Sequence, residues 1–240
     1  MNVRPYLIIN NNDSRNVLGL LISELAPITK PLQRTLIEEI DGRDGDIITP
    51  LGFASYDKVV KIALTYDYNI DDIIEFFEPS GVVVFSNEPD KYYRYIIYEQ
   101  INFERLIRFK TAEVSFHVQP FKFSEVDGEK TYNLSGSPNE LEIRNNGNYF
   151  SRPTLKITGS GVVEITLNNN EILTISFEDE DQTIIIDAEQ MNAIDEETGL
   201  LVNRLVVGNY DNIRLNKGSN IIGISGNVTK VKISNYSRWI

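Results

Sequence analysis

His117 is the only histidine of the 240-residue chain, and the chain has no cysteine. A Ser-His-Asp triad would have to be built around His117, and one histidine cannot supply the two or three ligands of common zinc sites. His117 stands between Phe116 and Val118 in an alternating segment, which is typical of the polar face of a strand. The lack of cysteine excludes disulfides, thiolate metal sites and cysteine nucleophiles. We therefore interpret His117 as a structural residue of a strand.

Carboxylates are the other side chains that could do chemistry, and they form two clusters. Asp41, Asp44 and Asp46 are spaced as calcium ligands can be, but the segment fails the EF-hand pattern of oxygen ligands, glycine and a final glutamate. Residues 178–181 are four consecutive acids, for which a solvated hairpin tip is the simplest interpretation. Nothing singles out a glycosidase pair among the 35 acids. The sequence thus predicts no metal site and no catalytic residue.

Motifs for nucleotide binding and hydrolysis are absent from the sequence, which has no P-loop, no G-x-G-x-x-G and no G-x-S-x-G. Gly159-Ser160-Gly161 is interpreted as a tight turn. The net charge of −12 argues against binding to phosphate backbones or anionic membranes, which need a basic surface. No apolar run approaches the roughly 20 residues that span a bilayer, and the first residues lack a signal-peptide pattern. We expect a non-enzymatic protein without cofactors, sequence-specific nucleic-acid binding or a membrane segment.

The first half of the chain predicts strands around one short helix. An alternating strand is expected over residues 56–66, with Lys58 as a charged exception on its apolar face. The apolar spacing after Asn69, a plausible N-cap, predicts a helix over residues 70–77. Residues 1–35 are expected to be irregular, and the turn-rich residues 39–52 to form a long loop or an excursion between strands. Further strands are predicted over residues 82–86, 92–98, 101–109 and 112–120.

The second half carries turn signals every 8–12 residues, as an antiparallel sandwich requires. Asn146-Gly147 is the strongest hairpin signal. Strands are predicted over residues 155–158, 162–167, 171–177, 183–187, 200–207, 221–225 and 229–236. The fold class is therefore mainly β, with two domains. Residues 1–124 are expected to form a β-sandwich with one short helix, and residues 125–240 a jelly-roll β-sandwich.

Aromatic residues suggest binding surfaces in both halves. Tyr92, Tyr93, Tyr95 and Tyr98 fall on both faces of one strand, so either one face meets a partner or both faces are buried. The alternative to an assembly role is a carbohydrate-binding protein, in which exposed aromatic side chains of the second half stack on host glycans. The candidate platform residues are Tyr132, Tyr149, Phe150, Phe177, Tyr210, Tyr236 and Trp239.

The order of the elements resembles the siphophage distal tail (Dit) family, also described as phage tail family proteins. In the first half the resemblance is carried by DGRDGDIITPLGFASYDKVVKIALTY, then a short helix, then VVVFSNEPDKYYRYIIY and a strand that ends in HVQPFKF. In the second half it is carried by NNGNY, SRPTLKI and the final GNVTKVKISNYSRWI, which are similar to a galectin-like or carbohydrate-binding-module-like domain. The resemblance covers nearly the whole chain.

This resemblance implies a structural protein of the virion tail tip, assembled in the bacterial host. Residues 1–124 would form a homo-hexameric ring, the hub that joins the tail tube to the baseplate, and residues 125–240 would project outward as a docking domain. The implied partners are the tail tube protein, the tape measure protein, the tail-associated fibre-like protein and, in some members, receptor-binding proteins. A hub in a prophage or bacteriocin-like tail is equally compatible with the sequence. Acids such as those in residues 41–46 would then line the lumen and keep passing DNA from sticking.

Overall fold

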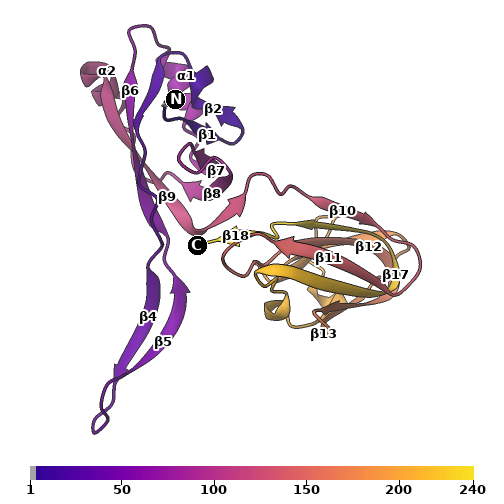
Figure 1. The fold of residues 1–240 in the computed structure, drawn as a ribbon. Coiled ribbons are helices and arrows are strands. Elements are labelled where there is room, and N and C mark those ends of the chain that lie inside the picture. Colours follow the sequence, from indigo (N-terminus) through magenta and orange to yellow (C-terminus); the bar gives the residue numbers. More distant parts are fainter. Residues whose placement is uncertain (1–3) are drawn as a thin grey trace. The chain divides into compact units, whose positions relative to one another are not determined.

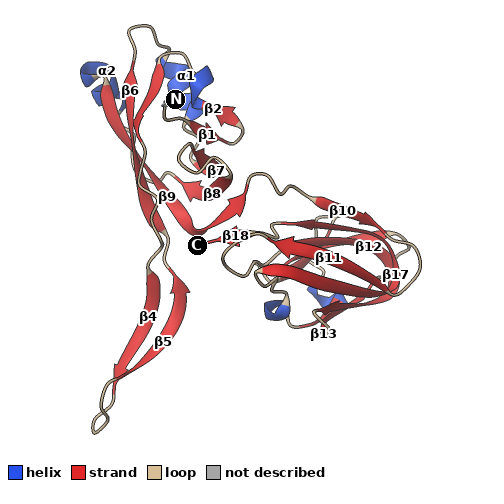
Figure 2. Ribbon diagram, viewed as in Figure 1, coloured by secondary structure: helices blue, strands red, loops and turns tan. Residues whose placement is uncertain are grey.

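The structure is a computed structural model that describes residues 4–240, and it divides into two compact units. The first unit ends at Glu125 and the second runs over Val126–Trp239. Strands dominate both units, and helices are few and short (Figure 2). The prediction of a mainly β chain is confirmed. No helix within residues 4–240 is long and apolar enough to cross a membrane.

The first unit is built on one antiparallel sheet with the strand order β2-β1-β7-β8-β9-β6-β3 (Figure 1). Its strands are β1 (Leu7–Ile9), β2 (Asn12–Asp13), β3 (Leu20–Glu24), β6 (Tyr56–Leu64), β7 (Ser80–Phe85), β8 (Lys91–Ile96) and β9 (Thr111–Ser124). Burial alternates along β6 and the first half of β9, so one face of these strands forms the core. That core includes Val60, Ile62, Val114 and Phe116. Because β1, β2 and β3 are regular strands, the prediction that residues 1–35 are irregular is wrong for much of residues 7–24; residues 25–32 are irregular as predicted, and residues 1–3 lie outside the described residues.

Two α-helices flank this sheet, one of them unexpected. In α1 (Ile70–Phe76), the side chain of Asn69 accepts a hydrogen bond from the Asp71 amide at 3.1 Å, which confirms the predicted cap. The predicted strand over residues 101–109 is wrong, because α2 (Phe103–Phe109) lies there. The Asn102 side chain caps α2, and Lys110 ends it with φ of 60°. The first unit therefore has two α-helices, where one was predicted.

A separate two-stranded sheet leaves the first unit as an arm. It consists of β4 (Gln33–Glu39) and β5 (Asp46–Phe53), which pair antiparallel with Glu39 opposite Asp46 at the far end. Of the two alternatives for residues 39–52, the long loop is wrong for most of the segment, whereas an excursion between strands agrees with an arm inserted between β3 and β6. The two glycines in the turn, Gly42 and Gly45, have φ of 80° and 76°. They bend only the tip, so the flanking residues remain free to pair.

The second unit consists of antiparallel strands arranged around two long central strands, β12 (Thr154–Leu167) and β17 (Gly218–Ser234). Most of the shorter strands pair with one or the other of these two or with each other. The first half of β12 pairs with β14 (Gln182–Asp187), and the second half pairs with β13 (Asn170–Ser176). Likewise, β17 pairs first with β11 (Asn139–Asn145) and then with β10 (Lys130–Asn133). The register between β12 and β17 shifts around Gly159 and again after Ser160. The tight turn predicted at Gly159-Ser160-Gly161 is wrong, because these residues lie inside β12, where they make an irregularity in the pairing. Long strands that bend in this way enclose the apolar core of a sandwich.

The remaining elements of the second unit are short. They are β15 (Asn192–Asp195), β16 (Val206–Gly208), β18 (Arg238–Trp239) and the 3-10 helices η2 (Asn203–Leu205) and η3 (Tyr210–Asn212); η1 (Ser14–Asn16) belongs to the first unit. The single strand predicted over residues 200–207 is wrong, since a 3-10 turn occupies its middle and only β16 is extended. The sandwich-like arrangement agrees with the predicted fold class, while its likeness to galectins stays a prediction.

Candidate functional site

His117 lies on β9 directly opposite Asp57 on β6. Its Nδ1 atom is 2.7 Å from an Asp57 carboxylate oxygen, and the ring of Tyr98 packs edge-on against it with centroids 5.3 Å apart. Both polar side chains are partly exposed, on the face of the sheet opposite the core. The pair links two neighbouring strands, as expected for a structural histidine.

The acidic clusters of the sequence are also placed by the structure. Asp41, Asp44 and Asp46 lie exposed around the tip of the arm. Glu178 forms a two-pronged ion pair with Arg204, with oxygen–nitrogen distances of 2.5 and 2.7 Å, next to the turn that was predicted there. Within residues 4–240, no group of three or more histidine, cysteine, aspartate or glutamate side chains is arranged to hold a metal ion.

The arm, residues 33–53, is the most unusual surface of the first unit. Every residue of β4 is exposed, and β5 is exposed except for the half-buried Ile47 and Phe53. Large apolar side chains are included: Ile37 is 58% exposed, Ile48 64% and Leu51 53%. A two-stranded ribbon is marginally stable alone, and its open edges favour pairing with another chain. Exposed apolar side chains grouped in this way mark an interaction surface.

Beneath the sheet of the first unit lies a buried group of charges, the Glu88 cluster, formed by Lys58, Glu88, Tyr93 and Lys122. One carboxylate oxygen of Glu88 lies 2.8 Å from the Lys122 ammonium, and the other accepts a hydrogen bond from the Tyr93 hydroxyl. Lys58 is 1% exposed and donates to the carbonyl oxygen of Pro27 at 2.9 Å. Its ammonium also lies 5.2 Å from the centre of the Tyr93 ring.

Two buried cations thus share one buried carboxylate. Desolvation lowers the pKa of Lys58 to about 8; the nearby Glu88 opposes this shift and Lys122 adds to it. Desolvation, reinforced by Glu88, raises the pKa of Tyr93. The sequence signals were Lys58 on an apolar face and Lys122 between two phenylalanines. The partner Glu88 was missed, because it lies in the turn before β8 and no periodicity marks it.

Lys58 should therefore contribute stability that increases as the pH rises from about 8 to about 10.5. In this window Lys58 is largely neutral when folded but still charged when unfolded, where its pKa is 10.5. The unfolded chain then binds more protons, so the free energy of unfolding rises by up to about 1 kcal/mol per pH unit. Urea unfolding at pH 8 and pH 10, compared between the unsubstituted protein and a Lys58 variant, measures this contribution, because both proteins keep the opposite contribution of tyrosines such as Tyr93. The variant Lys58→Met should lose that contribution, and equal slopes in the two proteins would contradict the assignment.

The tyrosine group resolves into two kinds of position. Tyr93 and Tyr95 are buried in the core, and the hydroxyl of Tyr95 donates to the Glu78 carbonyl at 2.9 Å. Tyr92 is half-buried and stacks on Phe123 with ring centroids 5.6 Å apart, while Tyr98 is 58% exposed. Only one face of β8 is therefore core. The expectation that its other face meets a partner stays a prediction.

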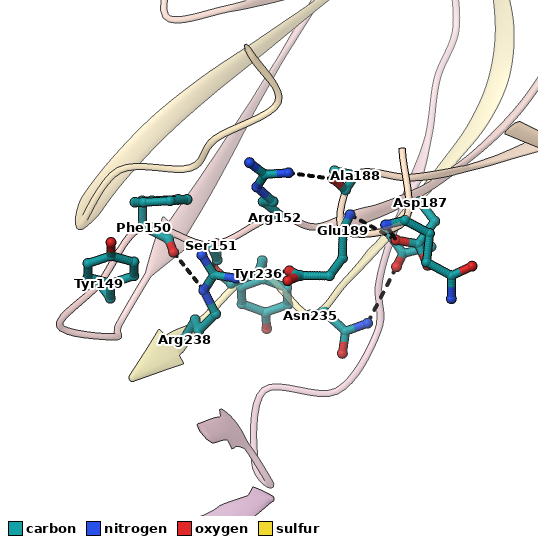
Figure 3. Close-up of polar contacts among 12 residues, drawn as sticks. Tyr149, Phe150, Ser151, Arg152, Asp187, Ala188, Glu189, Asn235, Tyr236 and Arg238 are labelled. Atoms are coloured by element: carbon teal, nitrogen blue, oxygen red, sulfur yellow. Dashed lines mark hydrogen bonds and ion pairs between the residues drawn. The ribbon is translucent and has the colours of Figure 1, made fainter. Parts of the chain in front are cut away.

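In the second unit, Arg238 forms the centre of a polar network (Figure 3). Its side chain is 2% exposed; Nε donates to the Phe150 carbonyl at 2.8 Å, and Nη1 lies 2.9 Å from a Glu189 oxygen. The guanidinium also lies over the rings of Phe150 and Tyr149, at 4.8 and 5.6 Å from their centroids. Desolvation lowers the pKa of Arg238 to about 10, opposed by Glu189, so the side chain remains charged at neutral pH. This network holds the last strand in place and is structural.

The proposed aromatic platforms for sugars are largely not free surfaces. Phe177 and Tyr236 are buried, so the prediction that they could stack on a glycan is wrong. A polar cleft of about 640 Å³ lies between the β12–β13 turn and η3, lined by Asn168, Glu171, Asp211, Asn212 and Arg214 among others. The residues that line this cleft include no aromatic side chain. Glycan recognition by the second unit stays a prediction.

Comparison with known proteins gives no match by sequence, whereas several solved structures match the chain. No protein-family model and no curated protein matches the chain. The chain is similar to the Dit protein of phage SPP1, with a TM-score of 0.63 and 14% sequence identity. The match covers 98% of this chain and 99% of that one. The SPP1 protein is described as a paradigm of the hub adsorption apparatus of phages that infect Gram-positive bacteria. It is also similar to a chain of the phage P2 baseplate, with a TM-score of 0.53 and 11% identity over 99% and 98% of the two chains. Across both units, the chain has the fold of the SPP1 Dit protein.

Proposed function

We propose that this chain is a structural hub protein of a long-tailed phage or prophage tail, with no catalytic role. The support is the likeness to the SPP1 Dit protein, which extends over 98% of the chain and includes both units. A tail hub is a scaffold, and the candidate chemistry of this chain is consistent with that. Its single histidine is paired within a sheet, and its buried charges are structural.

The assembly part of the proposal rests on the arm, whose two strands pair with each other and leave large apolar side chains exposed. A ring is built from heterologous contacts, in which one surface of a copy meets a different surface of the next. The arm supplies the first of these surfaces, because more than half of the surface of Ile37, Ile48 and Leu51 is exposed. We propose a ring of six copies, formed by the first unit at the distal end of the tail tube. The second unit would serve as the docking surface for baseplate components, and the ring would contact the tail tube and tape measure proteins.

Electron microscopy of the purified protein, combined with light scattering, tests the assembly. We expect ring particles with a mass six times 27.4 kDa. Replacing residues 34–52 with a short Gly-Ser turn should give single subunits at the same concentration, because it removes an interface of about 800 Å² per partner. The base of the arm is closed by the bond from the Ala54 amide to the Leu32 carbonyl at 2.8 Å, so the shortening should leave the main sheet intact.

Circular dichroism of the shortened variant provides the control, since its sheet content outside the arm should be preserved. Rings that persist without the arm would contradict its role in assembly. Immunogold labelling of intact virions tests the proposed location directly, and labelling anywhere other than the far tip of the tail would contradict the hub proposal.

A further inference from the structure

The short helix α2 carries a basic surface in a protein whose net charge is −12. We define the α2 surface as Arg105, Arg108 and Lys110 with the neighbouring Asn102 and Phe109. All five side chains belong to exposed residues, and Phe109 is 65% exposed. Two hollows of about 330 and 240 Å³ lie beside the helix and share Asn102 and Arg105. Residues 102–110 hold three cations and one acid, a net charge of +2.

The tip of the arm has the opposite charge. Residues 38–46 contain five acids and one arginine, a net charge of −4. Among the ion pairs of residues 4–240, none involves these five acids or the three cations of the α2 surface. Two exposed segments of opposite sign, each with exposed apolar side chains such as Ile40 and Ile107, thus have no ion-pair partner in the described part of their own chain, although the Lys110 ammonium lies over the Tyr68 ring at 4.4 Å. Complementary surfaces of this kind fix the register of a contact and speed its formation.

The two surfaces cannot meet within one copy. The arm leads into β6 at Tyr56, which pairs with Val118, whereas α2 leads into β9 at Thr111, which pairs with Ala63. The strand β6 therefore separates them by nine residues, or about 30 Å. Figure 1 shows α2 and the β4–β5 arm at opposite ends of the first unit. Surfaces at opposite ends of a subunit are suited to a head-to-tail contact.

We propose that the acidic tip of the arm docks on the α2 surface of a second copy of this chain. The inference rests on the proposed ring and identifies which two surfaces form its contact. Asp41, Asp44 and neighbouring acids face Arg105, Arg108 and Lys110 of the next copy, and Phe109 covers the apolar part of the arm. In this arrangement the acids at the tip of the arm serve subunit contacts and do not line the lumen.

Charge reversal tests the pairing. The variants Asp41→Lys/Asp44→Lys and Arg105→Glu/Arg108→Glu should each raise the concentration needed for ring assembly by at least about tenfold, because like charges then face each other. The chain that carries all four changes should recover most of the assembly, since the pairing is restored with reversed sign. The control Asp179→Lys/Glu180→Lys changes exposed acids of the second unit by the same charge and should assemble normally.

A cysteine cross-link provides a second readout. Because the chain has no native cysteine, only the introduced cysteines can form a disulfide. A mixture of Asp44→Cys and Arg108→Cys chains should form a disulfide-linked pair on oxidation, and a mixture of Asp179→Cys and Arg108→Cys chains should not. Rings that form without this cross-link, or without sensitivity to the charge reversals, would overturn the docking pair and leave the hub proposal standing. A cross-link in material too dilute to form rings would support the docking pair. Absence of both rings and cross-link would overturn both proposals.

Discussion

Replacing Glu88 with glutamine is expected to lower the free energy of unfolding by about 3–5 kcal/mol. The carboxylate of Glu88 is the counter-ion of two buried ammonium groups, those of Lys122 at 2.8 Å and of Lys58 nearby. Glutamine preserves the shape and can accept from Lys122 through its single amide oxygen, but its amide nitrogen then faces the Tyr93 hydroxyl as a donor. The loss therefore combines the missing charge with one rearranged hydrogen bond. Chemical denaturation followed by circular dichroism measures the change, and hydrogen exchange in peptides from β8 and β9 assigns it to the first unit.

The matched control for this experiment is Lys58→Met. This substitution removes one of the two cations together with its hydrogen bond to the Pro27 carbonyl, leaves the pair between Lys122 and Glu88 balanced, and keeps most of the side-chain length. Its free energy of unfolding should lie within about 1 kcal/mol of that of the unsubstituted protein at pH 7. If Glu88→Gln were as mild as Lys58→Met, the buried charges would be far better solvated than their burial indicates.

The second large effect is expected in the second unit, where Arg238→Met should lower the free energy of unfolding by about 2–4 kcal/mol. The substitution leaves the Phe150 carbonyl without its donor at 2.8 Å and removes the contacts of the guanidinium with two aromatic rings. Methionine fills most of the volume, so the cost reflects the polar and cation–π contacts more than a cavity. Thermal unfolding measures the loss, and the single tryptophan, Trp239, reports by fluorescence on the adjacent position.

Arg214→Met is the control for Arg238. Arg214 also lies over the Phe150 ring, at 5.0 Å, but its side chain is 45% exposed and its ion pair with Asp211 is 3.3 Å long. An exposed ion pair of this kind contributes under about 1 kcal/mol to the free energy of unfolding, so the Arg214 variant should lose no more than that. Comparable losses in the two variants would show that burial of Arg238 does not govern its contribution.

Several local signals were sufficient to predict the structure, although the Gly159-Ser160-Gly161 signal for a turn was not. The cap at Asn69, the alternation along residues 56–64 and the turn at residues 178–181 each follow from short-range chemistry, and all three are present. The strand predicted over residues 101–109 was wrong because a helical and a strand periodicity of apolar residues compete in this segment. Phe103, Leu106 and Ile107 match a helix, whereas Ile101, Phe103, Ile107 and Phe109 match a strand. The capping side chain of Asn102 favours the helix.

The arm and the Glu88 cluster were beyond the reach of sequence patterns for a different physical reason. Strands in a ribbon without a buried face have no apolar alternation, so β4 and β5 lack the signal by which strands are recognised. Glu88 and Lys122 are 34 positions apart and meet only because β8 pairs with β9. Long-range contacts of this type depend on the completed sheet, and no local window contains them.

The sharing of β12 and β17 between both layers of the second unit limits how this half of the chain can change. Each of these strands hydrogen-bonds to neighbours in one layer with its first half and in the other layer with its second half. Neither layer can therefore persist when the other melts, and the unit should respond to heat or denaturant as a single cooperative block. Insertions would be tolerated at its exposed turns, such as the one at Asn168 and Asn169, but a cut within either long strand would dismantle the whole sandwich.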